Sequence, residues 1–258
     1  MAEGIITRRG SGGIPIVRAT GGTVTDIEQD GQLFRVHKFT SDGALEVTRG
    51  GEVEYLVVGA GGGGRDGRRG GGGGGGGVVV GVETIGEGSF PVEIGEGVST
   101  GQTGENSVFG SVIALGGGRG DRGDGGSGGG GRSRTGGTPG GSGLQPSLST
   151  FSTAGFGNDG GRGNSSGSDS NRYGGGGGGA GGPGVDGTSS VGGAGGPGLD
   201  VSTVSGLTGT FAKGGTANNN NNDCPPNSGN GSNSPTGYES SNNFFSGSGI
   251  VFVRYRIG

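Results

Sequence analysis

The chain has 258 residues, of which 79 are glycine and only 9 are proline, and its formal net charge at pH 7 is −4. Hydrophobic residues make up 25% of it, too few for an ordinary globular enzyme, and the lack of a strict Gly-X-Y period excludes collagen. The net charge is also too small to hold a chain open by repulsion. The composition therefore points to a glycine-rich structural or interaction protein.

Residues 1–22 are predicted to form a short, extended N-terminal arm that docks on a partner. The apolar side chains of this arm are the docking candidates: Ile5, Ile6, Ile14, Ile16 and Val17. Short runs of β-branched and aromatic residues follow, separated by Gly and Asp turns, and they predict strands. These runs lie at 33–39, 45–48, 53–58, 78–82, 90–94 and 108–115, with a last one at 250–255. Residues 23–115 are therefore expected to form a β-rich base that includes the first glycine rods.

Blocks of glycine separate these strands and continue beyond them, at 61–64, 70–77, 116–118, 125–131, 174–184 and 192–198. Such blocks are either flexible linkers or rods of polyglycine II, which have three residues per turn and pair their backbone groups with neighbouring rods. The repeated phrase GGAGGPG and the alternation with polar segments favour rods. We expect a mostly β fold with irregular segments: the arm, a small β-strand base, and a packed bundle of polyglycine II helices with long connecting loops. Residues 116–258 form the glycine-rich domain in this prediction, closed by the strand at 250–255.

An ordered series of motifs resembles a known family, the glycine-rich domain of phage tail-fibre and other virion proteins. The motifs are VEYLVVGAGGGG at 53–64 before a glycine block, FPVEIGEG at 90–97, NSVFG at 106–110, ALGGG at 114–118, the block at 174–184 and GIVFVRY at 249–255. The resemblance runs from about residue 33 to the C-terminus. It implies a β-structured base with packed polyglycine II rods. It also implies, as in the receptor-binding adhesins of T-even-like phages, loops at the far end of the rods that contact the host surface. No large fibre-attachment domain precedes residue 23, so the position on a virion stays open between fibre tip, baseplate and capsid surface.

The loops between rods are the candidate receptor-binding sites. Tyr, Ser, Gly and Asn suit adaptable recognition surfaces, and Asn side chains can pair with saccharide hydroxyls. The candidates lie within 144–158, 164–173, 200–213 and 217–245, and they are Phe151, Phe156, Tyr173, Phe211, Asn220, Asn222, Tyr238 and Phe244. The alternative is that these segments are only turns, whose aromatic side chains fill gaps between rods.

No catalytic residue, cofactor site or metal site is predicted, and we expect a protein that is not an enzyme. The one histidine, His37, falls in a predicted strand, and the one cysteine, Cys224, supports no disulfide framework or cysteine metal site. We interpret the two RGD tripeptides at 119–124 as surface charge compensation. The arginines at 65, 68 and 69 resemble a nucleic-acid tract, but an acidic chain repels phosphate, so no nucleic acid is expected as a partner. No apolar run of 18 residues predicts membrane insertion.

Two functions from different classes follow. The first is a non-enzymatic bacteriophage tail-fibre or capsid-fibre protein, an adhesin that attaches to a host surface saccharide or outer-membrane protein through the loops. The alternative is a purely structural capsid- or tail-fibre component held to other virion proteins by the N-terminal arm. An extracellular-matrix or ice-binding protein fits less well, because the chain shows no signal peptide, disulfides or strict repeats. The expected location is the virion, assembled in the host cytoplasm and released by lysis, and a homotrimer is compatible with it. The sequence does not name the host or the receptor.

Overall fold

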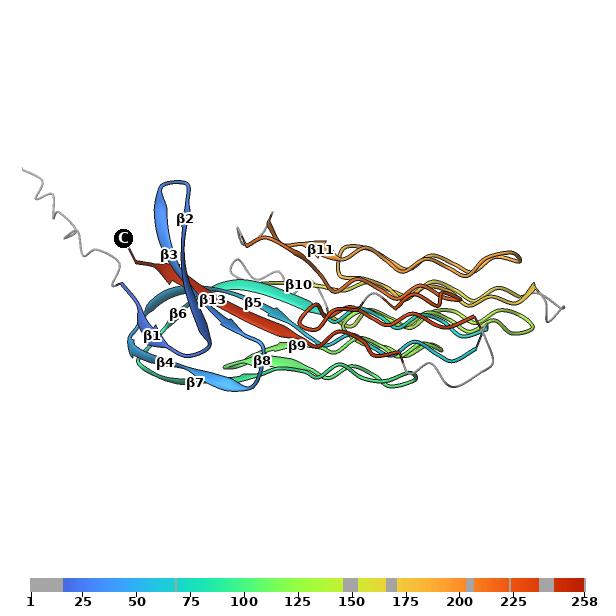
Figure 1. Ribbon diagram of the computed structural model, residues 1–258, viewed down its shortest axis with the longest axis horizontal. Helices are drawn as coiled ribbons and strands as arrows, with labels where there is room; N and C mark the ends of the chain where they lie inside the picture. Colours follow the sequence, from blue (N-terminus) through green and yellow to red (C-terminus); the bar gives the residue numbers. More distant parts are fainter. Residues whose placement is uncertain are drawn as a thin grey trace, which may run out of the picture.

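The computed structural model describes residues 16–67, 69–145, 153–165, 171–202, 207–222, 224–236 and 244–257 (Figure 1). In this part of the chain, every secondary-structure element with defined bounds is a β-strand, and the strands form two large sheets and a small one. None of the described residues belongs to a helix long and apolar enough to cross a membrane.

The larger sheet has six strands, and all its neighbours are antiparallel. In spatial order the strands are β10 (Thr153–Phe156), β6 (Val78–Ile85), β5 (Gly51–Val58), β13 (Ile250–Arg256), β3 (Gln32–Phe39) and β2 (Thr23–Gln29). The last strand of the chain thus lies between β5 and β3, with Val253 opposite Tyr55 on one side and opposite His37 on the other. The C-terminal strand therefore joins the two halves of this sheet.

The second sheet has five strands, again antiparallel. They are β1 (Arg18–Thr20), β4 (Gly43–Arg49), β7 (Gly88–Glu93), β8 (Ser107–Phe109) and β9 (Val112–Ala114), in that order. The predicted strand at 108–115 is in fact the hairpin of β8 and β9, because Gly110 turns the chain with a φ of 57°. A separate two-stranded sheet pairs β11 (Leu199–Asp200) with β12 (Thr210–Phe211).

The main hydrophobic core lies between the two large sheets. Alternate residues of β5 (Val53, Tyr55 and Val57) are buried there, together with Leu45 and Phe109 of the opposite sheet. The rings of Tyr55 and Phe109 are 5.8 Å apart. Because side chains along a strand point alternately to the two faces, the sequence VEYLVV supplies this core with every second residue.

The remaining residues of β5 face a second, smaller core. Leu56 and Val58 are fully buried, and they belong to the same cluster as Val201 and Phe211 from the β11–β12 region. The six-stranded sheet is therefore covered on both faces, which explains the run of four consecutive buried residues at the end of β5.

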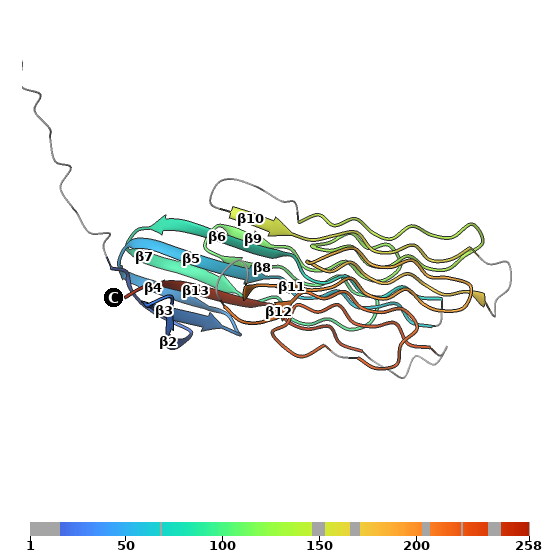
Figure 2. The same ribbon diagram turned by 90° about the horizontal axis from the view of Figure 1, so that it is seen from above.

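The glycine-rich segments leave the sheets on one side and run next to one another to a far end, where they turn back (Figures 1 and 2). We call these two ends of the molecule the sheet end and the far end. The segment at 70–77 lies among several others, and every third backbone amide of this segment donates to the same neighbouring segment. Gly72 and Gly75 donate to the carbonyls of Gly175 and Gly178, at 3.0 and 2.8 Å. Backbone hydrogen bonds between segments thus replace a hydrophobic core in this half of the molecule.

The absence of side chains is what permits this packing. A Cβ atom added to Gly74 would lie under 3.0 Å from the carbonyl oxygen of Ser127, and one added to Gly72 would lie equally close to that of Gly215. Only glycine lets backbones approach at this distance.

The expected fold, a small β-strand base carrying a packed bundle of polyglycine II helices, is wrong. The structure is all-β, built from antiparallel sheets, and its described glycine-rich segments form no helix. The structure also has more strands than predicted. β1, β2 and β10 extend the two large sheets, and β11 and β12 form the small one. Glycine imposes no repeating conformation on a segment. Each segment here takes its course from the neighbours to which its amides and carbonyls bond.

Candidate functional site

The turns at the far end form the surface that lies furthest from the sheets. Short-range backbone hydrogen bonds close several of them: Gly70 donates to Gly67, Gly137 to Arg134, and Thr188 to Val191. Residues 188–191 are all exposed at such a turn. Each turn is held from behind by the laterally bonded glycine segments, so polar side chains from distant parts of the chain are fixed on one surface.

One side of this surface is rich in asparagine, and it brings together three of the predicted binding residues: Asn220, Asn222 and Phe244. Asn220 is exposed, and its amide exchanges two hydrogen bonds with Thr236, at 2.7 and 2.9 Å. Asn222 donates to the carbonyl of Phe245 at 2.7 Å. The amides of both asparagines are therefore engaged in holding neighbouring segments together, and the structure assigns them a positioning role.

The sequence identified only one of the two phenylalanines on this side. Phe244 is half-buried, and its carbonyl accepts a bond from the hydroxyl of Thr100 at 3.5 Å. The following residue, Phe245, is 55% exposed and was not among the predicted site residues. An apolar side chain this exposed among polar asparagines can serve as an anchor for a ligand. Two adjacent phenylalanines in a polar segment were the available signal.

The other predicted binding residues are placed differently. Tyr173 is half-buried at the far end, where its backbone amide donates to the side chain of Asn164 at 2.8 Å. Phe156 is a residue of β10 that packs on the second core, and Phe211 of β12 is only 9% exposed within that core. These two lie at the sheet end, and packing accounts for them without a ligand. Phe151 and Tyr238 lie outside the described residues.

The predicted docking residues of the N-terminus also differ in placement: one is buried, one is exposed and three lie outside the described residues. Val17 is 3% exposed and belongs to the main core, whereas Ile16 is 46% exposed. The strand β1 that follows pairs with β4, so residues 18–20 are part of the five-stranded sheet. Ile5, Ile6 and Ile14 lie outside the described residues, and the docking role stays a prediction.

A hollow of about 720 Å³ opens where the segment after β7 leaves the sheet. Its walls include Asp42, Glu96 and Glu105. The carboxylate of Asp42 accepts a hydrogen bond from the amide of Ile94 at 2.8 Å, and that of Glu105 accepts one from the amide of Glu96 at 3.1 Å. Two of the acidic side chains thus hold backbone in place. In the described part of the chain, no group of three or more His, Cys, Asp or Glu residues could hold a metal ion.

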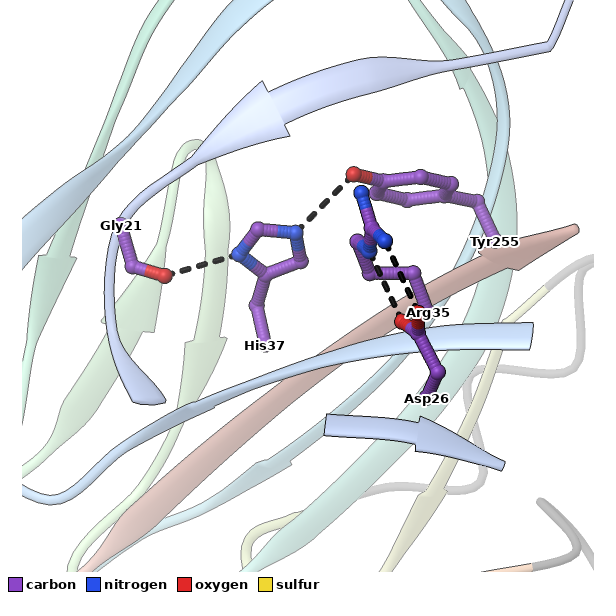
Figure 3. Close-up of polar contacts among 5 residues, drawn as sticks. All are labelled: Gly21, Asp26, Arg35, His37 and Tyr255. Atoms are coloured by element: carbon purple, nitrogen blue, oxygen red, sulfur yellow. Dashed lines mark hydrogen bonds and ion pairs between the residues drawn. The ribbon is translucent and has the colours of Figure 1, made fainter. Parts of the chain in front are cut away.

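A buried polar cluster lies at the sheet end, around His37 (Figure 3). The imidazole is fully buried, with Nδ1 2.8 Å from the carbonyl oxygen of Gly21 and Nε2 3.0 Å from the hydroxyl of Tyr255. Because a carbonyl can only accept, Nδ1 carries the proton of the neutral ring, and Nε2 accepts from Tyr255. Nearby, Arg35 holds Asp26 through two bonds of 2.8 Å. The cluster ties the turn before β2 to β3 and β13.

Burial is the main cause that lowers the pKa of His37, because the charged imidazolium loses its hydration in the protein. Burial also raises the pKa of the Tyr255 phenol, while hydrogen bonds from the backbone of Ala19 and from Arg35 oppose that rise. The Tyr255 oxygen therefore already accepts bonds, and a protonated His37 would present it with one donor more. The arrangement favours neutral histidine and serves to join strands.

We expect the protein to lose stability as the pH falls below about 6.5, the ordinary pKa of histidine. Above this pH, His37 is neutral in both folded and unfolded chains. Below it the unfolded chain binds a proton before the folded one does, so the free energy of unfolding falls by up to about 1.4 kcal/mol per pH unit. The pKa of Asp26 is lowered, chiefly by its hydrogen bond with Arg35, so it contributes only in more acidic solution. Urea unfolding at pH 8 and pH 5 measures the difference. The variant His37→Gln should show a smaller difference, and an equal one would contradict the assignment.

A family model described as a glycine-rich domain matches residues 40–256, which includes most strands and all the glycine-rich segments described above. A search of curated proteins found no match.

Proposed function

Because the chain belongs to the glycine-rich domain family, we propose that it is a non-enzymatic phage virion protein that attaches to the host cell surface through its far turns. The single observation that carries the proposal is the grouping of turns at the far end. Turns from distant parts of the sequence are collected on one surface, and hydrogen-bonded glycine segments hold them at a distance from the sheets. Such a scaffold can vary its turns without changing its backbone packing, as binding proteins with variable loops do.

The positions of the chain ends support the same orientation. Residue 16 leads into β1, and the amide of Ile257 bonds to the carbonyl of Leu33 at 2.9 Å, so both described ends lie at the sheet end (Figure 1). A protein fixed to a particle at the sheet end would present its far turns outward. Other virion structural proteins are the proposed partners at the sheet end, with a host saccharide or outer-membrane protein at the far end.

The test is adsorption. Purified, fluorescently labelled protein is added to a panel of bacterial strains, and its ability to block phage adsorption is measured on the strains that it labels. We expect labelling of at least one strain and competition on that strain. A folded protein that labels no strain and blocks no adsorption would favour the alternative function, a purely structural capsid- or tail-fibre component.

A matched pair of variants tests whether the far turns carry the attachment. Phe245 is 55% exposed at the far end, and Leu33 is 42% exposed on β3 at the sheet end. Both alanine variants should fold with unchanged melting temperature, because neither side chain is buried. We expect Phe245→Ala to lower the affinity for cells about tenfold, the loss usual for a binding anchor of at least about 1.4 kcal/mol, and Leu33→Ala to leave it unchanged. An equal affinity of the two variants would place the attachment elsewhere.

A further inference from the structure

Another group of turns at the far end is rich in arginine rather than asparagine. Six arginines lie on its turns or directly beside them: Arg69, Arg122, Arg132, Arg134, Arg162 and Arg172. The side chains of Arg122, Arg134 and Arg162 are exposed, and the other three residues are half-buried. We call these six residues the arginine patch.

Hydrogen bonds place the segments that carry these arginines next to one another. Arg162 donates from Nη2 to the carbonyl of Gly136 at 2.8 Å, and Arg172 donates to the hydroxyl of Thr135 at 3.2 Å, so both contact the turn that begins at Arg134. Two backbone bonds add the remaining segments. The amide of Ser133 donates to the carbonyl of Arg69 at 2.9 Å, and that of Arg122 donates to the carbonyl of Gly130 at 3.3 Å. Segments that lie far apart in the sequence thus meet on one surface.

Positive charge exceeds negative charge around the patch. The described residues of 65–71, 118–137, 160–175 and 184–192 contain eight arginines and four aspartates. The contact of Arg134 with Asp121 is loose, at 3.9 Å, and leaves the Arg134 side chain 59% exposed. Asp186 accepts from the backbone amide of Arg162 at 2.6 Å.

The sheet end has the opposite balance. Residues 16–64, 78–115 and 250–257 hold twelve Asp and Glu residues against six Arg and Lys. The net charge of −4 therefore conceals an acidic sheet end and a basic far end. Repulsion of phosphate by an acidic chain, which the net charge predicts, therefore does not apply to the far end.

Two residues in a turn of the patch adopt a backbone conformation that is rare for residues with a side chain. Asp121 and Arg122 adopt φ values of 76° and 73°, in the left-handed region that glycine occupies at much lower cost. Glycine would serve the backbone better at both positions. Residues held in such conformations cluster at functional sites.

We propose that the arginine patch binds a polysaccharide that carries phosphate or carboxylate groups, and this proposal rests on the attachment function proposed above. Guanidinium groups bind such anions through paired N–H donors. Single exposed contacts of this kind are weak, and a polymer with repeated charges engages several at once. A nucleic acid is less favoured, because proteins that bind single strands stack bases on aromatic side chains. Among the described residues of the patch and its turns, Tyr173 is the one aromatic.

Charge-matched variants test the proposal. The double variant Arg122→Gln/Arg134→Gln removes two charges from the patch. The control Arg18→Gln/Arg49→Gln removes two exposed charges that face each other across β1 and β4 at the sheet end. The probes are polygalacturonate, a glycerol-phosphate teichoic acid, neutral dextran and a single-stranded DNA of similar length, with affinity measured at two salt concentrations.

We expect wild-type protein and the control to bind at least one of the two anionic glycans, more weakly at high salt, and not to bind dextran. The patch variant should lose affinity about tenfold. The glycan that binds distinguishes phosphate from carboxylate. Equal affinity of the two double variants, failure to bind either glycan, or tighter binding to DNA than to both glycans would overturn the proposal.

Adsorption of the same proteins to cells distinguishes failure of this inference from failure of the proposed attachment function. A protein that attaches to cells without binding anionic glycans retains the attachment function and loses this inference, whereas a protein that attaches to no strain loses the attachment function.

Discussion

Replacing Gly74 with alanine should lower the free energy of unfolding by about 3 kcal/mol, which for a domain of this size corresponds to a melting temperature lower by roughly 6–12 °C. Gly74 donates its amide to Gly118 at 2.7 Å and accepts from the amide of Gly62 at 2.8 Å. An added methyl group would meet the carbonyl of Ser127, which is backbone and cannot rotate away. The neighbouring segment must therefore move, and the hydrogen bonds on both sides of Gly74 lengthen or break.

The control is Gly86→Ala, in the turn between β6 and β7. A Cβ atom there meets nothing within 4 Å. This variant should be neutral or slightly more stable, because alanine restricts the unfolded chain more than glycine does. Thermal unfolding followed by circular dichroism compares the two. Equal melting temperatures for Gly74→Ala and Gly86→Ala would show that close backbone packing does not stabilise this half of the molecule.

The second large effect is expected at Phe211, a residue that the sequence suggested as part of the binding surface. It is 9% exposed in the second core, and its ring meets that of Phe252 edge-on at 6.1 Å. Truncation to alanine should cost about 3–5 kcal/mol, from lost burial and from the cavity that remains. The same truncation at Phe245, which is 55% exposed, should change stability by no more than about 0.5 kcal/mol.

Chemical denaturation of the two alanine variants gives the comparison directly. If Phe211→Ala were as stable as Phe245→Ala, the small sheet of β11 and β12 would not be packed on the large one as described. Together with cell adsorption, the pair also separates the two roles that aromatic residues play in this chain. Phe211 should matter for stability, and Phe245 should matter for attachment.

The candidate site shows how far residue types alone can lead. Asn220, Asn222 and Phe244 were proposed from an aromatic-and-asparagine composition, and they do lie together at the far end. The same composition selected Phe156 and Phe211, of which the first packs against the second core and the second belongs to it, because sequence does not tell an aromatic on an exposed turn from one that covers a sheet. The arginine patch was missed because its members come from segments far apart in the sequence, and only the tertiary structure brings Arg162 and Arg172 to the turn of Arg134.

The sequence by itself determined the strands of the sheet interior and the membership of the glycine-rich domain family. Runs such as 53–58 and 250–255 alternate or concentrate apolar residues, and such patterns predict strands wherever they pair. The tertiary structure alone decided that β13 lies between β5 and β3. It alone also decided which neighbours each glycine segment bonds to. A glycine carries no side chain to mark its face or its partner. The course of these segments, the size of the sheets and the separation of charge between the two ends follow from contacts between distant residues, which composition and local pattern do not record.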